Sequence, residues 1–184
     1  MNSSIFKKII IIYLIINTVF LISILFARAN NEIEIIAEEI SLDKKTNIID
    51  AEGKVLIQNK ELLINSDKVI FDKSKNSIKA TNNVKINDKY NNNYYSDNFK
   101  SNDDFSNASA DNIKIRLNDG SRIVGRFLKR QNGINVIKNS QYTPCNENNY
   151  IIENCPGWKL KSETVYHDEA TKSMHYDHST LYIL

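Results

Sequence analysis

ISLDKKTNIIDAEGKVLI occupies residues 40–57, and VIFDKSKNSIKATNNVKI follows at residues 69–86, a constant 29 positions later. The two stretches align without a gap, and the alignment places Asp72 on Asp43. Apolar residues alternate with polar ones on both sides of the polar cluster that begins at each aspartate, and this period of two is typical of β-strands. The repeat therefore predicts a strand-turn-strand unit that is used at least twice.

Weaker copies of this unit follow along the chain. Residues 96–99, 110–113 and 162–168 repeat parts of it. No part of the body sustains the spacing of apolar residues that an amphipathic helix requires. Because a single unit cannot bury its own apolar face, the units must stack. We predict an all-β body at residues 30–184, built as an open-sided roll of stacked antiparallel strands.

The apolar positions that share strand parity and recur in the repeat are predicted to point to the inner face. They are Ile40, Leu42, Ile49, Val55, Ile57, Val69, Phe71, Ile78, Val84 and Ile86. A ligand-binding groove and an ordinary core require the same alternation, so both interpretations stay open on periodicity alone. The terminal units leave open sheet edges, to which another chain can add a strand. We expect the first such edge near residues 33–40.

Residues 1–29 have the three parts of a secretory signal. Lys7 and Lys8 form a basic start, an apolar run of 18 residues extends from Ile9 to Phe26, and Ala27-Arg28-Ala29 is a small-x-small cleavage site. We predict cleavage after Ala29 and export of the body. The alternative is an uncleaved anchor helix, because the run is longer than the usual apolar region of about 7 to 15 residues.

The charge of the body argues against nucleic-acid binding. The whole chain has 24 basic and 22 acidic residues, a formal charge of +2. Three basic residues lie in the leader, which leaves 21 against 22 and a net charge of −1. A nucleic-acid-binding surface requires a basic patch, and none is predicted here.

The sequence contains no pattern typical of an enzyme or a cofactor site. A Gly-x-Ser-x-Gly elbow, a His-Glu-x-x-His pair and a glycine-rich phosphate loop are all absent from it. His167, His175 and His178 are the three histidines, and the last two would point to opposite faces of a strand. We therefore predict no catalytic residues, no cofactor and no metal site.

Residues 37–55, AEEISLDKKTNIIDAEGKV, resemble the OstA-like repeat. In that repeat an Ala-Asp-x-Val-x-Tyr-Asp stretch leads to a Val-x-Ala-x-Gly-Asn-Val stretch, and it is shared by the periplasmic proteins of the lipopolysaccharide transport bridge. Asn82-Asn83-Val84 departs from the pattern, where Gly-Asn-Val is more typical.

The later residues are similar to the end of the N-terminal domain of LptD-type assembly proteins. They are RLNDGSRI at 116–123, YTPC at 142–145, PGWKLK at 156–161 and VYHDE at 165–169. On this resemblance, residues 142–184 form a junction segment, and the sequence ends at Leu184 where family members continue into an outer-membrane β-barrel.

The resemblance implies a periplasmic β-jellyroll, associated with the outer membrane, whose apolar interior holds the acyl chains of lipopolysaccharide. The implied partners are lipopolysaccharide, an LptA-like bridge protein that pairs by strand addition, and an outer-membrane barrel with its lipoprotein partner if a barrel is encoded separately. Two alternatives remain: a stand-alone bridge or adaptor of the LptA or LptC type, and a purely structural β-domain of the envelope.

Cys145 and Cys155 are the only two cysteines. An even count in an exported chain predicts a disulfide, whose closed loop would contribute on the order of 2 to 3 kcal/mol in the chain-entropy model. Two thiols without a neighbouring ligand pair are too few for a structural zinc site. In some members of the resembled family, comparable cysteines bridge to the barrel.

Overall fold

The computed structural model describes residue 13 and residues 33–59, 62–145 and 157–183. The body from Ile33 onward is a unit by itself. The predicted leader helix and its cleavage site, Ala27 and Ala29, lie outside the described residues. Within the part of the chain that is described, no helix is long and apolar enough to cross a membrane.

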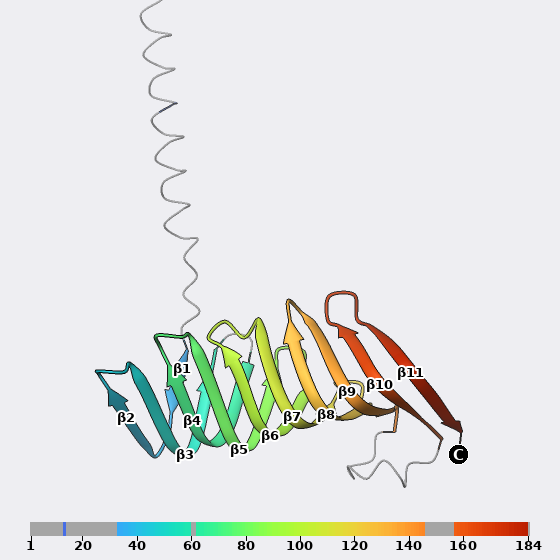
Figure 1. Ribbon diagram of the computed structural model, residues 1–184, viewed down its shortest axis with the longest axis horizontal. Coiled ribbons are helices and arrows are strands. Elements are labelled where there is room, and N and C mark those ends of the chain that lie inside the picture. Colours follow the sequence, from blue (N-terminus) through green and yellow to red (C-terminus); the bar gives the residue numbers. More distant parts are fainter. Residues whose placement is uncertain (1–12, 14–32, 60–61, 146–156, 184) are drawn as a thin grey trace, which may run out of the picture. The chain divides into compact units, whose positions relative to one another are not determined.

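The body is one antiparallel sheet of eleven strands (Figure 1). Its strands are β1 (Glu34–Ile36), β2 (Glu39–Asp43), β3 (Ile48–Gln58), β4 (Leu62–Asp72), β5 (Ser77–Asp88), β6 (Asn93–Asn102), β7 (Asn107–Arg116), β8 (Arg122–Gln131), β9 (Ile134–Thr143), β10 (Trp158–Asp168) and β11 (Ser173–Ile183). From β3 to β11 every strand pairs with its neighbours in sequence, while β1 and β2 both pair with β3. The prediction of an all-β open antiparallel sheet is confirmed.

The repeat corresponds to two consecutive hairpins, β2–β3 and β4–β5. Asp43 and Asp72 each accept a hydrogen bond from the backbone N–H two residues later, at 2.8 and 3.1 Å. Asn47 and Asn76 close the two turns in the left-handed region, with φ of 57° and 48°. Asp168 accepts the same bond, at 2.9 Å, in the β10–β11 turn. These local side-chain bonds explain why the same turn recurs at matched positions.

Each long strand bends near its middle, and the bends lie at the same level in neighbouring strands. On β4, β6 and β10 the hydroxyls of Ser66, Ser96 and Ser162 donate to the backbone carbonyl two residues later, at 3.2, 2.8 and 3.0 Å. The pairings of β3 with β4, β4 with β5 and β5 with β6 shift register at this level, as β-bulges do. On the alternate strands, residues with positive φ occupy this level: Gly53, Lys54, Asn82, Asn83, Asn112, Asn139 and His178.

Asn82 and Asn83 therefore form the bend of β5 in the same way that Gly53 and Lys54 form the bend of β3 one repeat earlier. Asparagine adopts the left-handed conformation more readily than most residues, so the departure from Gly-Asn-Val does not alter the bend. The bends fold the sheet along one line, called the corner here. The half of each strand next to the β2–β3 and β4–β5 turns belongs to the first flank, and the half next to the β3–β4 and β5–β6 turns belongs to the second. The roll thus comes from folding one sequentially paired sheet.

Three rows of cross-strand neighbours cover the inner face of this folded sheet. Row 1 is Leu42, Ile49, Phe71, Ile78, Ser101, Ala108, Arg130, Asn135, His167 and Met174. Row 2 is Ile40, Ala51, Val69, Ala80, Phe99, Ala110, Leu128, Ile137, Val165 and Tyr176. Row 3 is Ile35, Ile57, Ile64, Ile86, Tyr94, Ile115, Ile123, Tyr142, Leu160 and Leu181.

Rows 1 and 2 lie on the first flank and row 3 on the second. Val55, Val84 and Ile113 lie beside the corner and are at most 1% exposed. Together with most members of rows 2 and 3 they form a single hydrophobic cluster. The core of the molecule is therefore the space between the two flanks.

Candidate functional site

The inner face between the flanks is the candidate site, because the structure places all ten predicted residues on it. Six of them are at most 5% exposed: Val55, Ile57, Val69, Ile78, Val84 and Ile86. Ile49 and Phe71 are half-buried. Ile40 and Leu42 are 49% and 51% exposed, because β2 is an edge strand without a further neighbour to cover them.

The prediction missed the continuation of the rows beyond β5. Phe99, Ile115, Ile123, Leu128, Ile137 and Val165 are all at most 5% exposed and belong to the same cluster. The weaker copies at residues 96–99, 110–113 and 162–168 were the signal for it. In those copies only parts of the unit survive, so the repeat is harder to recognise, although Asp168 keeps the turn hydrogen bond of Asp43 and Asp72.

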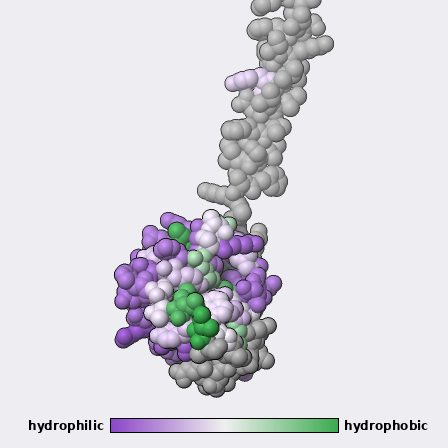
Figure 2. Space-filling model, turned by 90° about the vertical axis from the view of Figure 1, so that its right-hand side faces the viewer, coloured by the Kyte–Doolittle hydropathy of each residue, from purple (hydrophilic) through white to green (hydrophobic). Residues whose placement is uncertain are grey.

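The apolar interior is cut open at both ends of the sheet. At the first edge, Ile40 and Leu42 on the inner face are about half exposed, and so is Ile36 on the outer face. At the last edge, Leu181 and Ile183 are 55% and 82% exposed. Figure 2 faces this last edge and shows a hydrophobic patch surrounded by hydrophilic surface. Large apolar side chains gathered at an open edge are typical of an interaction site.

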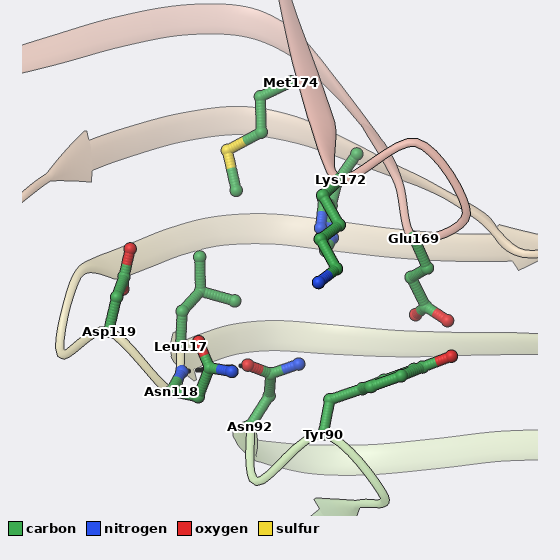
Figure 3. A pocket seen from close by; sticks show the side chains of 9 residues that line it. Tyr90, Asn92, Leu117, Asn118, Asp119, Glu169, Lys172 and Met174 are labelled. Atoms are coloured by element: carbon green, nitrogen blue, oxygen red, sulfur yellow. Dashed lines mark hydrogen bonds between the residues drawn. The ribbon is translucent and has the colours of Figure 1, made fainter.

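Opposite the corner, the turns of the two flanks meet along a seam, where there is a pocket of about 300 Å³. Its lining is Tyr90, Asn92, Leu117, Asn118, Asp119, His167, Glu169, Lys172 and Met174. Figure 3 shows that residues of the β5–β6, β7–β8 and β10–β11 turns approach it from opposite sides. Leu117 and Met174 also pack against the core, so the pocket connects the polar seam with the apolar interior.

A charged group is built into the inner wall beside this pocket. The Arg130 guanidinium donates to both carboxylate oxygens of Glu169, and its Nη2–Oε2 distance is 2.9 Å. The Asn135 side chain, itself only 2% exposed, donates to the same carboxylate at 2.8 Å. Burial acts to lower the pKa of Arg130, but the hydrogen bonds and charge of Glu169 outweigh it, so the pKa is raised. Arg130 therefore stays charged in its partly buried position.

The opposite flank presents Tyr94 and Asp88 to this group. The Tyr94 hydroxyl donates to Asp88 at 3.1 Å. Burial is the main cause that raises the pKa of Tyr94, and the charges of Asp88 and Glu169 add to it while Arg130 opposes it. Burial lowers the pKa of His167 below its ordinary value, so its imidazole is neutral at neutral pH. Charged and polar groups of both flanks therefore meet inside an otherwise apolar interior.

Toward the last edge the interior becomes aromatic. The ring of Tyr142 lies 5.6 Å from that of Trp158 and 6.0 Å from that of Tyr176, centroid to centroid. Burial raises the pKa of Tyr176 to about 12. These tilted rings pack together from β9 to β11, and Tyr142 and Tyr176 also pack against the core.

The histidines are not brought together. His178 lies 3.2 Å from Asp177 and 3.6 Å from Glu163, while the ring of His175 packs on Tyr166. Among the described residues, no group of histidine, cysteine and acidic side chains could hold a metal ion. Cys145 lies just after β9, but Cys155 is outside the described ranges, so their predicted pairing remains a prediction.

A folded single sheet with a continuous apolar interior defines the class as an all-β domain built from one antiparallel sheet around a hydrophobic core. Residues 34–133 match the family described as LptA/(LptD N-terminal domain) LPS transport protein. The match spans more than half of the chain, which therefore belongs to this family of lipopolysaccharide transport domains. These are periplasmic, non-enzymatic domains, so the prediction that the chain is not an enzyme is confirmed.

One similar solved structure is LptH, described as the LptA homologous periplasmic component of the lipopolysaccharide transport device from Pseudomonas aeruginosa. The two chains are 10% identical, the likeness covers 84% of this chain and 96% of LptH, and the TM-score is 0.33. So distant a likeness adds nothing to the assignment. None of the curated proteins matches the sequence.

Proposed function

We propose that this domain receives the acyl chains of lipopolysaccharide between its two flanks and belongs to an LptD-type assembly protein. The observation that carries the proposal is the set of apolar rows, which run from β1 and β2 to β11 and are exposed at both edges. Acyl chains that pack against these rows gain about 25 cal/mol per Å² of apolar surface removed from water.

The described structure has its flanks packed together, since Ile57, Ile64 and Ile78 are at most 1% exposed. A lipid must therefore separate the flanks at the seam and take over their contacts. The corner is suited to act as the hinge of this movement, because its bulges carry few ladder hydrogen bonds. The headgroup can then remain at the polar seam while the acyl chains lie inside.

The test is photocrosslinking to lipopolysaccharide from neighbouring positions of β4. A photoreactive residue in place of Phe71, which faces the interior, is expected to label strongly. The same residue in place of Ile70, on the opposite face, or of Lys73, in the exposed turn, is expected to label weakly. Equal labelling at the three positions would show that the lipid binds to the outer surface instead.

The assignment to an LptD-type protein is supported by YTPC at residues 142–145 and PGWKLK at residues 156–161, which lie beyond the family match. A stand-alone LptA-like bridge remains the second candidate, because both sheet edges are open and apolar. We propose that an LptA-like bridge protein adds a strand at the first edge, beside β1 and β2, where Ile36, Ile40 and Leu42 are exposed.

Substitutions at the two edges test this docking site. Ile40→Lys with Leu42→Lys is expected to weaken binding of a purified LptA-like bridge protein by at least about tenfold, which corresponds to about 1.4 kcal/mol. Leu181→Lys, at a residue of similar exposure on the last edge, is the matched control. Circular dichroism checks that both variants fold. If only Leu181→Lys weakens binding, the bridge protein docks at β11 and the proposed edge is wrong.

A further inference from the structure

The inner wall changes character part of the way along the sheet, and only in one row. Row 1 is apolar at Leu42, Ile49, Phe71 and Ile78, has the small residues Ser101 and Ala108 on β6 and β7, and continues with Arg130, Asn135 and His167 on β8, β9 and β10. Rows 2 and 3 remain apolar or aromatic as far as β11. An acyl chain that lies along the first flank therefore meets a polar wall at β8.

The charged group at this point spans strands and flanks. Glu169 directly follows β10 and reaches Arg130 on β8, and Asn135 on β9, between them, donates to the same carboxylate. Only 28% of the Arg130 side chain and 11% of the Glu169 side chain are exposed. The charges of Tyr94 and Asp88, on the second flank, act on the pKa of Arg130. The polar group therefore spans three neighbouring strands of the first flank.

Stability alone does not account for a charged pair here. Desolvating two charges costs several kcal/mol per ion, and well-packed apolar residues of similar size are often as stable or more so. Rows 2 and 3 fill the neighbouring positions of the same strands with apolar residues such as Leu128 and Ile123. The charged pair is thus the exception in this wall, and along row 1 it stands between the apolar residues of β2 to β5 and Met174 on β11.

We propose that Arg130 and Glu169 form a polar partition that ends the acyl-binding part of row 1. Acyl chains that lie along row 1 bind between β3 and β7, and they reach Met174 on β11 only when the ion pair opens. This inference rests on the proposed function. Glu169 lines the seam pocket, which gives its carboxylate room to leave Arg130. Figure 3 shows the Glu169 side chain directed into that space.

The test compares lipopolysaccharide crosslinking at two positions of row 1, Phe71 before the partition and Met174 beyond it. In the otherwise unchanged chain, Phe71 is expected to label and Met174 to label weakly. In the double variant Arg130→Met with Glu169→Met, labelling at Met174 is expected to rise about tenfold while labelling at Phe71 is unchanged. Both charges are removed together, because either one alone would remain buried and unpaired.

The matched control is Lys68→Met with Glu52→Met, which removes an ion pair between neighbouring strands on the outer face. It is expected to leave both labels unchanged. The reversed pair, Arg130→Glu with Glu169→Arg, restores a polar wall and is expected to keep Met174 weakly labelled, which covers the case that the double methionine variant does not fold.

The outcomes separate this inference from the proposed function. Labelling at Met174 that is equal with and without the ion pair overturns the partition, while labelling at Phe71 still supports lipid binding in the interior. Absence of labelling at Phe71 in every variant overturns the proposed function.

Discussion

Ile64→Asp is expected to abolish cooperative folding of the body. Ile64 is completely buried in row 3, between Ile57 and Ile86 on the neighbouring strands. An aspartate there would place a charge in the core without a partner, at a cost of several kcal/mol. Domains of this size have a free energy of unfolding of only about 5–15 kcal/mol. Thermal unfolding followed by circular dichroism measures the effect.

Asn65→Asp is the matched control for this substitution. Asn65 is the next residue of β4 and points to the outer face, opposite Lys85 on β5. A carboxylate at that position is solvated, so its effect on the free energy of unfolding is expected to stay within about 0.5 kcal/mol. Similar melting temperatures for the two variants would contradict the assignment of row 3 to the core.

Gly125→Ala is expected to destabilise the domain by about 1–3 kcal/mol, and Gly125→Val by more. Gly125 lies on β8 at the corner, opposite Ile113. A Cβ atom there would lie 2.3 Å from Ile137 Cγ2 and 3.3 Å from the Lys138 carbonyl oxygen. The glycine is therefore required by the close approach of β9. Urea denaturation gives the change in free energy.

A second substitution that relieves this clash tests whether the contact with Ile137 causes the loss of stability. Ile137→Leu moves the branch away from the β-carbon and conserves volume, so alone it is expected to cost less than about 1.5 kcal/mol. In the double variant with Gly125→Ala, the loss in free energy of unfolding should be smaller than the sum of the two single losses, because the contact with Cγ2 is gone. Strict additivity would show that Gly125 is needed for another reason.

Most of the local structure could be predicted from the sequence. The alternation in residues 40–57 and 69–86 determines which side chains share a face, because successive side chains of a strand point to opposite faces of the sheet. Asp43 and Asp72 determine their turns, because each side chain bonds to backbone only two residues away. The ten predicted inner residues were identified for this reason, and Ile40 and Leu42 differ only because their strand is an edge.

The polar interior could not be predicted in this way. Arg130 and Glu169 are 39 residues apart, and each belongs to a stretch that reads as an ordinary polar segment. They meet only because β8, β9 and β10 pair in one particular register. Folding of the sheet at the corner brings Tyr94 of the second flank near them and puts Ile137 against Gly125.

The sequence by itself therefore determined the strands, their turns, the inner face and the family resemblance, since each depends on neighbouring residues or on a repeated pattern. The tertiary structure alone decided where the two flanks meet, where the seam pocket lies and which charges face the interior. Those features depend on contacts between distant segments, and no local pattern encodes the angle at which the sheet folds.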